Sequence, residues 1–333
     1  MKSFRLFFVP SLLFLVLVAC SSEDANMEGV VQLDFMFWGD VSEQKAVEEM
    51  VAAFNEEHPD IHVHARHVPD EYETRMTTLL AADDLPDVAY LNTAQALSWA
   101  RDGHILELTE YAELYPELTK RIPESYLYFD EGKIAGNTTA VETMQLFYNK
   151  EIFAELGVEH PPARADEAWS WDEMVEAAKT LTIDRNGNNA HDPNFDPNAI
   201  QQYGLSIPGW YFPWHSLLIN NGADFFNEDG TEFILDEPEG VEVLQAIQDL
   251  MHTHHVAPTP TQQGDMPATS VSLQTKRIAM VIDGQWMINT FANDGLNFGV
   301  GVTPVFEKGR TSIASIESGA SVIFSSTEYL RKP

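Results

Sequence analysis

Cysteine is almost absent from this 333-residue sequence, in which Cys20 is the only one. No disulfide can therefore form within the chain, which excludes the small disulfide-stapled scaffolds. Basic residues are also scarce: 19 lysines and arginines stand against 52 aspartates and glutamates, and the formal net charge is −33. Because such a surface repels phosphate backbones, we exclude nucleic acid as a partner.

Long hydrophobic runs are confined to the N-terminus. Two basic residues precede an apolar run from Phe7 to Val18, and Cys20 follows it. The run is too short to remain in a bilayer and has the layout of a secretory signal. Leu-Val-Ala-Cys, ending at Cys20, resembles the bacterial lipobox, which implies a signal peptide at 1–19, lipidation of Cys20 and a polar tether at 20–29. The alternative is an ordinary signal peptide with an incidental cysteine.

Repeats of solenoid period and low-complexity blocks are also absent, and the length suits two globular domains. Three segments have the composition of strands: Val30 to Trp38, Ile61 to Val68 and Val88 to Leu91. Between them, apolar residues recur at the spacing of amphipathic helices. Ser42 and Thr93 stand where helix N-caps are expected. The alternation of strand and helix predicts a mostly parallel, doubly wound sheet.

The second half of the chain repeats this pattern. Gln145 to Tyr148 and Ile278 to Ile282 have the composition of strands. Ser170 and Glu173 have the spacing of a capping box, and Val241 to Met251 has helical spacing. The fold class is therefore α/β, with two lobes.

Several motifs, each weak alone, occur together in one order. They are Pro86-Asp87-Val88 with Leu91-Asn92-Thr93, Phe147-Tyr148-Asn149-Lys150, Asn221-Gly222-Ala223-Asp224, and Ala279-Met280-Val281 leading to Gly284-Gln285-Trp286. Together they resemble the family 1 extracellular solute-binding proteins, the maltose and maltodextrin type. The resemblance extends from about Val30 to the last residue.

The resemblance implies a two-lobed clamp of the periplasmic-binding-protein type, each lobe a mostly parallel sheet flanked by helices. Lobe 1 would hold 30–141 and 311–333, lobe 2 would hold 143–310, and the hinges would lie near Glu142 and Thr311. The family's C-terminal helices are missing, so we expect lobe 1 to be truncated. The implied function is that of the substrate-binding component of an ABC importer, which captures a carbohydrate and delivers it to the membrane permease. This component is expected to be a monomer without enzymatic activity. It would lie outside the cytoplasm, anchored to the cell membrane by its lipid.

Aromatic and polar residues fall at predicted strand ends, where ligands of such sheets bind. A neutral sugar needs aromatic rings for its C–H face and carboxylates or amides for its hydroxyls. Trp286 and Tyr211 match stacking positions of the family, and Asp40 and Glu142 match its acidic positions. The full set of candidate ligand-binding residues is Trp38, Asp40, Asn92, Thr93, Gln95, Glu142, Trp210, Tyr211, Asp283 and Trp286.

Structural roles are the alternative for several of these residues. Trp286 could be a core tryptophan, Asp40 and Thr93 could be helix caps, and Phe212 and Trp214 are expected to pack.

Metal sites are weakly indicated. One loop carries side-chain oxygens at a spacing that suggests a structural calcium site, from Asp184, Asn186, Asn188 and Asp192. The glycine of this loop is misplaced for an EF-hand. A polar surface turn is the alternative. The histidines at 62, 64, 252, 254 and 255 lack a third ligand at predictable spacing, so surface histidine is favoured over a metal-binding receptor. Apart from these metals, no cofactor is expected.

A secreted glycoside hydrolase is the main alternative function, because paired carboxylates suit that chemistry. Asp40 and Glu142 come from separate segments, however, and no nucleophile elbow, zinc-binding helix motif or phosphate loop occurs. The sequence therefore favours a binding protein.

Overall fold

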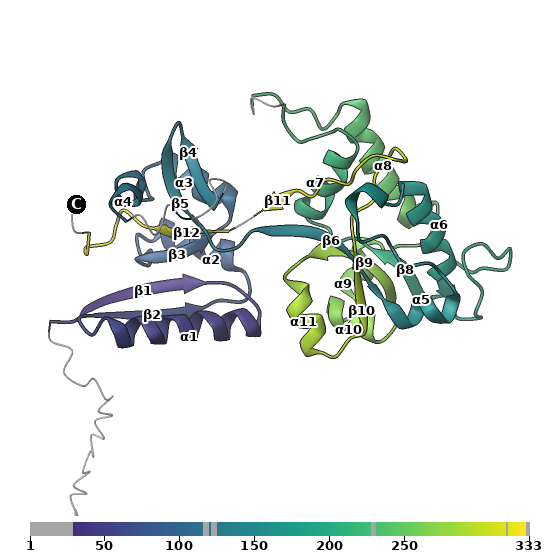
Figure 1. The fold of residues 1–333 in the computed structure, drawn as a ribbon, viewed down its shortest axis with the longest axis horizontal. Coiled ribbons are helices and arrows are strands. Elements are labelled where there is room, and N and C mark those ends of the chain that lie inside the picture. The colour runs from purple at the N-terminus through teal and green to yellow at the C-terminus, as the bar shows by residue number, and fades with distance from the viewer. Residues whose placement is uncertain (1–28, 116–119, 121–124, 228–230, 318, 331–333) are drawn as a thin grey trace, which may run out of the picture.

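The computed structural model describes residues 29–115, 120, 125–227, 231–317 and 319–330 (Figure 1). The predicted signal peptide, Cys20 and all but the last residue of the tether lie outside the described residues. Two groups of elements stand side by side in Figure 1, each built on its own sheet. We call the residues on the first sheet lobe 1 (29–138 and 319–330) and those around the second sheet lobe 2 (142–315).

Lobe 1 has a six-stranded sheet in the order β2-β1-β3-β12-β5-β4. Strands β1, β2 and β3 are parallel, whereas β12 is antiparallel to both β3 and β5. The elements are β1 (Val31–Phe37), α1 (Val41–Glu57), β2 (Ile61–His67), α2 (Tyr72–Ala81), β3 (Val88–Leu91), α3 (Thr93–Arg101), α4 (Thr109–Leu114), β4 (Tyr126–Asp130), β5 (Lys133–Thr138) and β12 (Ala320–Ile323).

Lobe 2 has a sheet in the order β10-β6-β9-β8-β7, with β11 paired to β6. Strands β8 and β9 are parallel, and β6 is antiparallel to β9. The elements are β6 (Glu142–Asn149), α5 (Lys150–Leu156), the 3-10 helix Ala165–Glu167, α6 (Trp171–Leu181), β7 (Ile183–Asp184), β8 (Ile200–Ser206), α7 (Tyr211–Asn220), α8 (Pro238–His252), α9 (Pro260–Gly264), α10 (Thr269–Gln274), β9 (Ile278–Gly284), α11 (Met287–Asn293) and β10 (Phe298–Gly301). The short strand β11 (Ile316–Glu317) follows lobe 2 and pairs with the start of β6.

Position in the sheet explains the strand sequences. Every residue of β9 is buried, because the strand lies between β6 and β8, and its sequence is accordingly apolar almost throughout. Strand β2 is at an edge, and its residues alternate between partly buried and exposed from Val63 onward. The expected α/β class with two lobes is confirmed. The sheets are mixed and not mostly parallel as expected, because β12, β5 and β4 in lobe 1 and β10, β6 and β7 in lobe 2 pair antiparallel with their neighbours.

The chain passes between the lobes twice, at 139–141 and around β11 (Figure 1). The backbone N–H of Thr139 donates to the carbonyl of Gly319 at 2.9 Å, which ties the two passages together. Before the second passage, Ile313 and Ser315 hydrogen-bond to Asn220 and Ser216 of α7. Residues 311–315 therefore belong with lobe 2, and the return to lobe 1 comes later than the boundary at 311 that the sequence suggested.

Candidate functional site

The residues that follow β1 lie close to the residues that follow β9. Thr290 in α11 donates its hydroxyl to Oδ2 of Asp40 at 2.8 Å, and Nδ2 of Asn293 donates to Oγ of Ser42 at 3.1 Å. These hydrogen bonds join residues some 250 positions apart. They bring the carboxyl ends of parallel strands from both sheets together, and this edge-to-edge region is our candidate site.

Asp40 is the N-cap of α1, which confirms the structural alternative given for this residue, whereas Ser42 does not have the capping role predicted for it. Oδ1 of Asp40 accepts from the backbone N–H groups of Ser42 and Glu43 at 2.8 and 2.9 Å. Burial would raise the pKa of Asp40, but the hydrogen bonds from Glu43, Thr290 and Ser42 together hold it below its ordinary value. The carboxylate is thus ionised at neutral pH and already engaged at both oxygens.

A glycine is required immediately before this cap. Gly39 has φ +138°, and a Cβ there would lie 2.4 Å from Oε2 of Glu43, which folds back over it. His67, at the end of β2, contacts the Gly39 carbonyl through Nε2 at 2.8 Å. The turn after β1 is therefore fixed from both sides.

Asn92, not Thr93, caps α3, which is a second correction. Oδ1 of Asn92 accepts from the backbone N–H of Gln95 at 2.9 Å. The amide of Gln95 lies 3.4 Å from Oγ1 of Thr77 in α2, so it is directed within lobe 1. Thr93 is the first residue of α3 and also has polar contacts. These three predicted ligands thus have structural roles in lobe 1.

Trp38 packs within lobe 1. Its ring meets Tyr72 and Tyr90 edge-on, at centroid distances of 5.1 and 5.3 Å. A Cβ at Gly319 would lie 2.4 Å from the Trp38 ring, so the ring also rests against the second passage between the lobes. Its surroundings are those of a packing residue at the edge of the core.

Glu142 stands at the first residue of β6, where the chain enters lobe 2. Burial, with the negative charge of Glu43 second, raises the pKa of Glu142 to about 7. Burial also raises the pKa of Glu43, and Asp40 adds to that shift while His67 opposes it. Three carboxylates therefore influence one another where the lobes meet.

Lobe 2 contributes three aromatic rings at the carboxyl ends of β8 and β9. Trp210 lies 6.0 Å from Trp286 and 5.7 Å from Tyr211, centroid to centroid. Trp210 and Tyr211 are 39% and 48% exposed, whereas Trp286 is half-buried and its ring rests on the Gly284 backbone. The three predicted aromatic ligands are thus brought together, while Phe212, as expected, is fully buried.

Asp283 lies one residue before the end of β9 and is only 7% exposed. Its Oδ1 accepts from the backbone N–H of Gly284 at 2.7 Å, and its Oδ2 has no hydrogen-bond partner in the described part of the chain. Burial raises the pKa of Asp283 to about 6, against a lowering by that hydrogen bond. The side chain of Asp283 is thus buried at the end of β9, with Oδ1 engaged by the backbone.

Sequence reasoning missed Glu43, Thr290 and Asn293. Glu43 lies three residues after Asp40 on the first turn of α1, so a sequence signal for it existed in the helix periodicity. Nothing in the sequence pairs Thr290 and Asn293 with α1, because their contacts depend on how the lobes meet.

The suspected calcium loop is a hydrogen-bonded turn. Oδ1 of Asp184 accepts from the N–H groups of Asn186 and Asn188, and Oδ2 accepts from the side chain of Asn188 and the N–H of Asp196, all at 2.8–3.1 Å. Burial opposes these hydrogen bonds but is outweighed, and the pKa of Asp184 falls to about 2. Asp192 accepts from Asn194 in the same way. The lone pairs that calcium would need on Asp184 are used by the turn.

The histidines considered as metal ligands, at 62, 64, 252, 254 and 255, lie on β2 and at or just after the end of α8. His62 and His64 adjoin each other on β2, with ring centroids 4.5 Å apart, and His64 pairs with Gln32. Within the ranges that the structure describes, no three histidine, cysteine, aspartate or glutamate side chains are grouped so that they could hold a metal ion.

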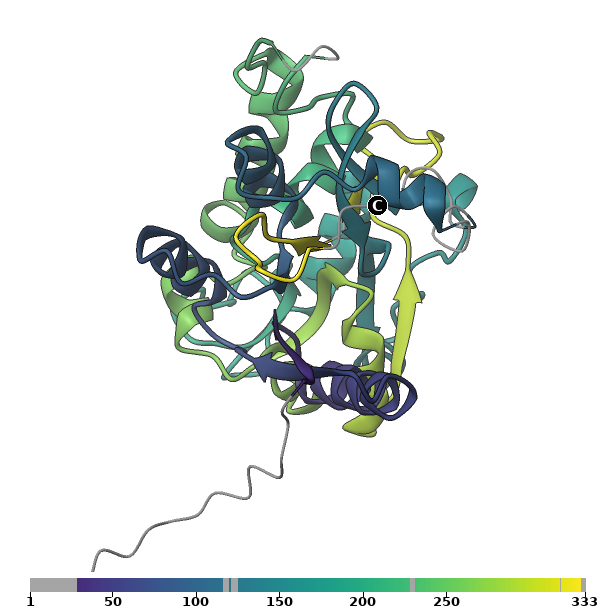
Figure 2. The same cartoon turned by 90° about the vertical axis from the view of Figure 1, so that its left-hand side faces the viewer.

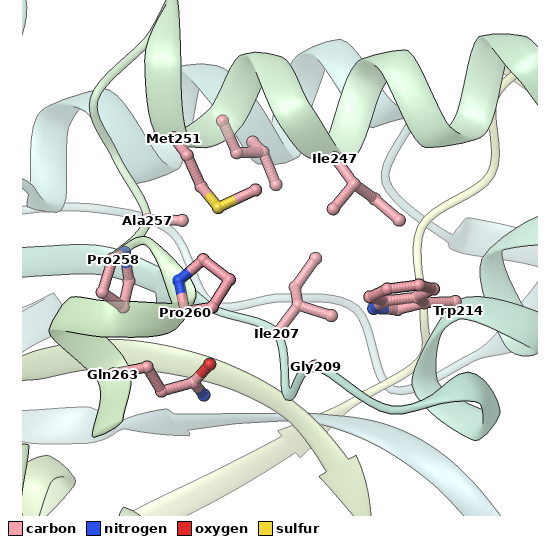
Figure 3. A pocket seen from close by; sticks show the side chains of 10 residues that line it. Ile207, Gly209, Trp214, Ile247, Met251, Ala257, Pro258, Pro260 and Gln263 are labelled. Carbon is pink, nitrogen blue, oxygen red and sulfur yellow. The ribbon is translucent and has the colours of Figure 1, made fainter.

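A mainly apolar, partly open pocket of about 40 Å³ lies in lobe 2 (Figure 3). Trp214, Ile247 and Met251 line it, together with Ile207 and the segment 257–263. None of the ten predicted ligand residues takes part, so the pocket is separate from the candidate site. No helix within the described ranges is both long and apolar enough to cross a membrane.

Two α/β lobes with their candidate site residues at facing strand ends have the architecture of a two-domain substrate-binding fold. Solved structures agree: the ABC substrate-binding protein of Listeria monocytogenes in complex with cycloalternan is similar, with a TM-score of 0.77 and 24% identity over 90% of this chain and 72% of that one. The maltose/maltodextrin-binding domain MalE of Bdellovibrio bacteriovorus, bound to maltotriose, has a TM-score of 0.72 and 20% identity, with the same coverage. These likenesses concern the fold.

Residues 38–327 match the family described as bacterial extracellular solute-binding protein, and the chain belongs to this family. Two curated relatives are arabinooligosaccharide-binding proteins, from Halalkalibacterium halodurans (25% identical, 91% of this chain) and Bacillus subtilis (24% identical, 75% of this chain). The chain spans 66% and 54% of their lengths.

Proposed function

We propose that the chain is the carbohydrate-capturing component of an ABC importer and catalyses no reaction. The observation that carries the proposal is the group of three neighbouring rings, Trp210, Tyr211 and Trp286, of which Trp210 and Tyr211 are exposed. Such rings stack on the C–H face of a sugar, and carboxylates accept its hydroxyls. The names of the relatives, which concern arabino-oligosaccharides and multiple sugars, support the same ligand class.

In this proposal the ligand is held between the lobes, and the passages at 139–141 and around β11 act as hinges. Glu142 contributes from the hinge, while Asp40, Asn92, Thr93 and Gln95 support the lobe 1 side without direct contact to the sugar. The closed monomer would then be recognised by the membrane permease outside the cytoplasm.

Thermal-shift screening of the purified chain against neutral sugars tests this proposal. The panel contains arabinose, maltose and oligomers of each, because a ligand at a hundred times its Kd stabilises the folded state by about 2.7 kcal/mol. A shift with at least one neutral carbohydrate is expected. No shift with any of them, together with a shift on adding zinc, would favour a metal-binding receptor instead.

The same oligosaccharides, incubated with the chain and analysed for shorter products, test the proposed absence of catalysis. We expect no release above that of buffer alone. Turnover that disappears in Glu142→Gln would identify a glycoside hydrolase.

We also propose that Cys20 is lipidated and anchors the chain at the membrane. Cys20→Ser should move the protein from the membrane to the soluble fraction, because the acyl chains supply most of the membrane affinity. Ser21→Ala is the matched control and should leave the partition unchanged. Membrane retention of Cys20→Ser would exclude the anchor.

A further inference from the structure

Among the described residues, two hydrogen bonds join the lobes, and both connect the N-terminal end of α1 with α11. Thr290 donates to Oδ2 of Asp40 at 2.8 Å, and Asn293 donates to Oγ of Ser42 at 3.1 Å. We call these four residues the α1–α11 contact. In Figures 1 and 2, α1 and α11 lie on the same, lower side of the molecule, and in Figure 1 the β6 and β11 passages lie above them.

Each side of the contact is rigidly attached to its own lobe. On the lobe 2 side, Phe291 of α11 is fully buried, and its ring meets Phe147 at 5.2 Å and Phe298 at 5.5 Å. On the lobe 1 side, Asp40 caps a helix whose Val47 and Val51 are buried. Because neither side can move alone, the contact constrains the angle between the lobes.

The contact also constrains the aromatic rings. Trp286 immediately precedes α11, and its ring lies on Gly284 and 6.0 Å from Trp210. Holding α11 against α1 therefore fixes the distance between Trp286 and the lobe 1 edge. Any ligand that spans the two edges has to fit this distance.

Asp40 is committed to the contact. Oδ1 accepts two backbone N–H groups, and Oδ2 accepts the Thr290 hydroxyl. Three of the roughly four lone-pair positions of this carboxylate are thus used, so at most one position on Oδ2 remains for another donor. The geometry assigns Asp40 to the positioning of the lobes.

We propose that Thr290 and Asn293 are positioning residues that set the affinity for the ligand by holding the lobes in their closed, ligand-competent arrangement, without touching the ligand. This inference rests on the proposed function. The reason is thermodynamic: if only the closed arrangement binds, the apparent Kd is the intrinsic Kd divided by the closed fraction. Loss of the contact lowers that fraction and weakens binding.

Thr290→Val and Thr290→Ser form a matched pair, because valine keeps the shape of threonine without the hydroxyl and serine keeps the hydroxyl. Affinity for the sugar found in the screen is measured by isothermal titration. We expect a threefold to tenfold weaker affinity for Thr290→Val, since one hydrogen bond to a carboxylate is lost, and near-parental affinity for Thr290→Ser. Ser42→Ala removes the second hydrogen bond and should weaken binding by less, about twofold to threefold.

A measured distance between the lobes distinguishes an effect on closure from the loss of a direct contact with the ligand. Spin labels at Glu49→Cys in α1 and Val271→Cys in α10, both exposed, are introduced into the Cys20→Ser chain. Without sugar, Thr290→Val should show a broader and longer distance distribution than the parent, and saturating sugar should restore the parental distance.

Two results would overturn the inference. Unchanged affinity together with an unchanged distance in Thr290→Val would mean that the contact does not set closure. Tighter binding in Thr290→Val would mean that the sugar competes with Thr290 for Asp40. If the parent chain binds no sugar at all, the proposed function fails, and the sugar-free distances still decide whether the contact holds the lobes together.

Discussion

The two edges that meet at the candidate site are built differently. On the lobe 1 edge, the polar groups of Asp40, Asn92 and Gln95 serve helix caps and contacts within the chain. On the lobe 2 edge, Trp210 and Tyr211 expose their rings. Since a group that is already satisfied gains little from a ligand, we propose that lobe 2 carries most of the recognition and that lobe 1 provides a rigid partner for closure.

The two tryptophans that follow β1 and β9 offer the sharpest test of this difference. Trp38→Ala should destabilise the protein by about 3 kcal/mol, because it removes a ring packed on Tyr72 and Tyr90. Chemical denaturation measures this loss. At a temperature where the variant is folded, its affinity for sugar should remain close to that of the parent, and a large loss of affinity with unchanged stability would place Trp38 among the ligand contacts.

The rings of lobe 2 should behave in the opposite way. Trp286→Ala and Tyr211→Ala are each expected to weaken sugar binding by about 1–3 kcal/mol while the fold is retained. Phe233→Ala is the matched control, because Phe233 is a 56% exposed ring that pairs with Phe226. Titration calorimetry should show normal binding for the control. Normal binding in Trp286→Ala would show that this ring packs within lobe 2 and does not contact the sugar.

The fold was largely predictable because local patterns determine its elements. The apolar run at Ile278 to Ile282 indicated a buried strand, and β9 is the strand between β6 and β8. The capping box of Ser170 and Glu173 is present as predicted. The caps of α1 and α3 were misassigned because two capable residues stand close together at each helix start, and the choice depends on where the extended backbone ends.

The site was predictable only in part. Strand-end residues were correctly located, since the alternation of strands and helices fixes which edge they share. Whether a polar group at that edge is free or engaged could not be predicted, because its partners come from elsewhere, as with Asp40 and Thr290. The influence of Glu43 on Glu142 likewise depends on how the chain enters lobe 2.

Glu142 offers the smallest but most diagnostic effect, a dependence of stability on pH. Its pKa is raised to about 7 by burial and by the charge of Glu43, so the folded state holds a proton that the unfolded state has already lost between about pH 4.5 and 7. The stability that this group contributes is complete below its pKa in the unfolded state and is lost as the pH rises through its pKa in the folded state.

In Glu142→Gln this loss of stability is absent. The variant should therefore equal the parent near pH 4 and exceed it at pH 8, by less than about 1 kcal/mol, because solvent screens a partly exposed group. Thermal unfolding of both proteins across this range measures the difference, and Glu56→Gln, at an exposed position of α1, is the control. A variant that is less stable than the parent at pH 8 would show that the ionised carboxylate is stabilised at the hinge, and that lobe 1 does more there than provide a rigid edge.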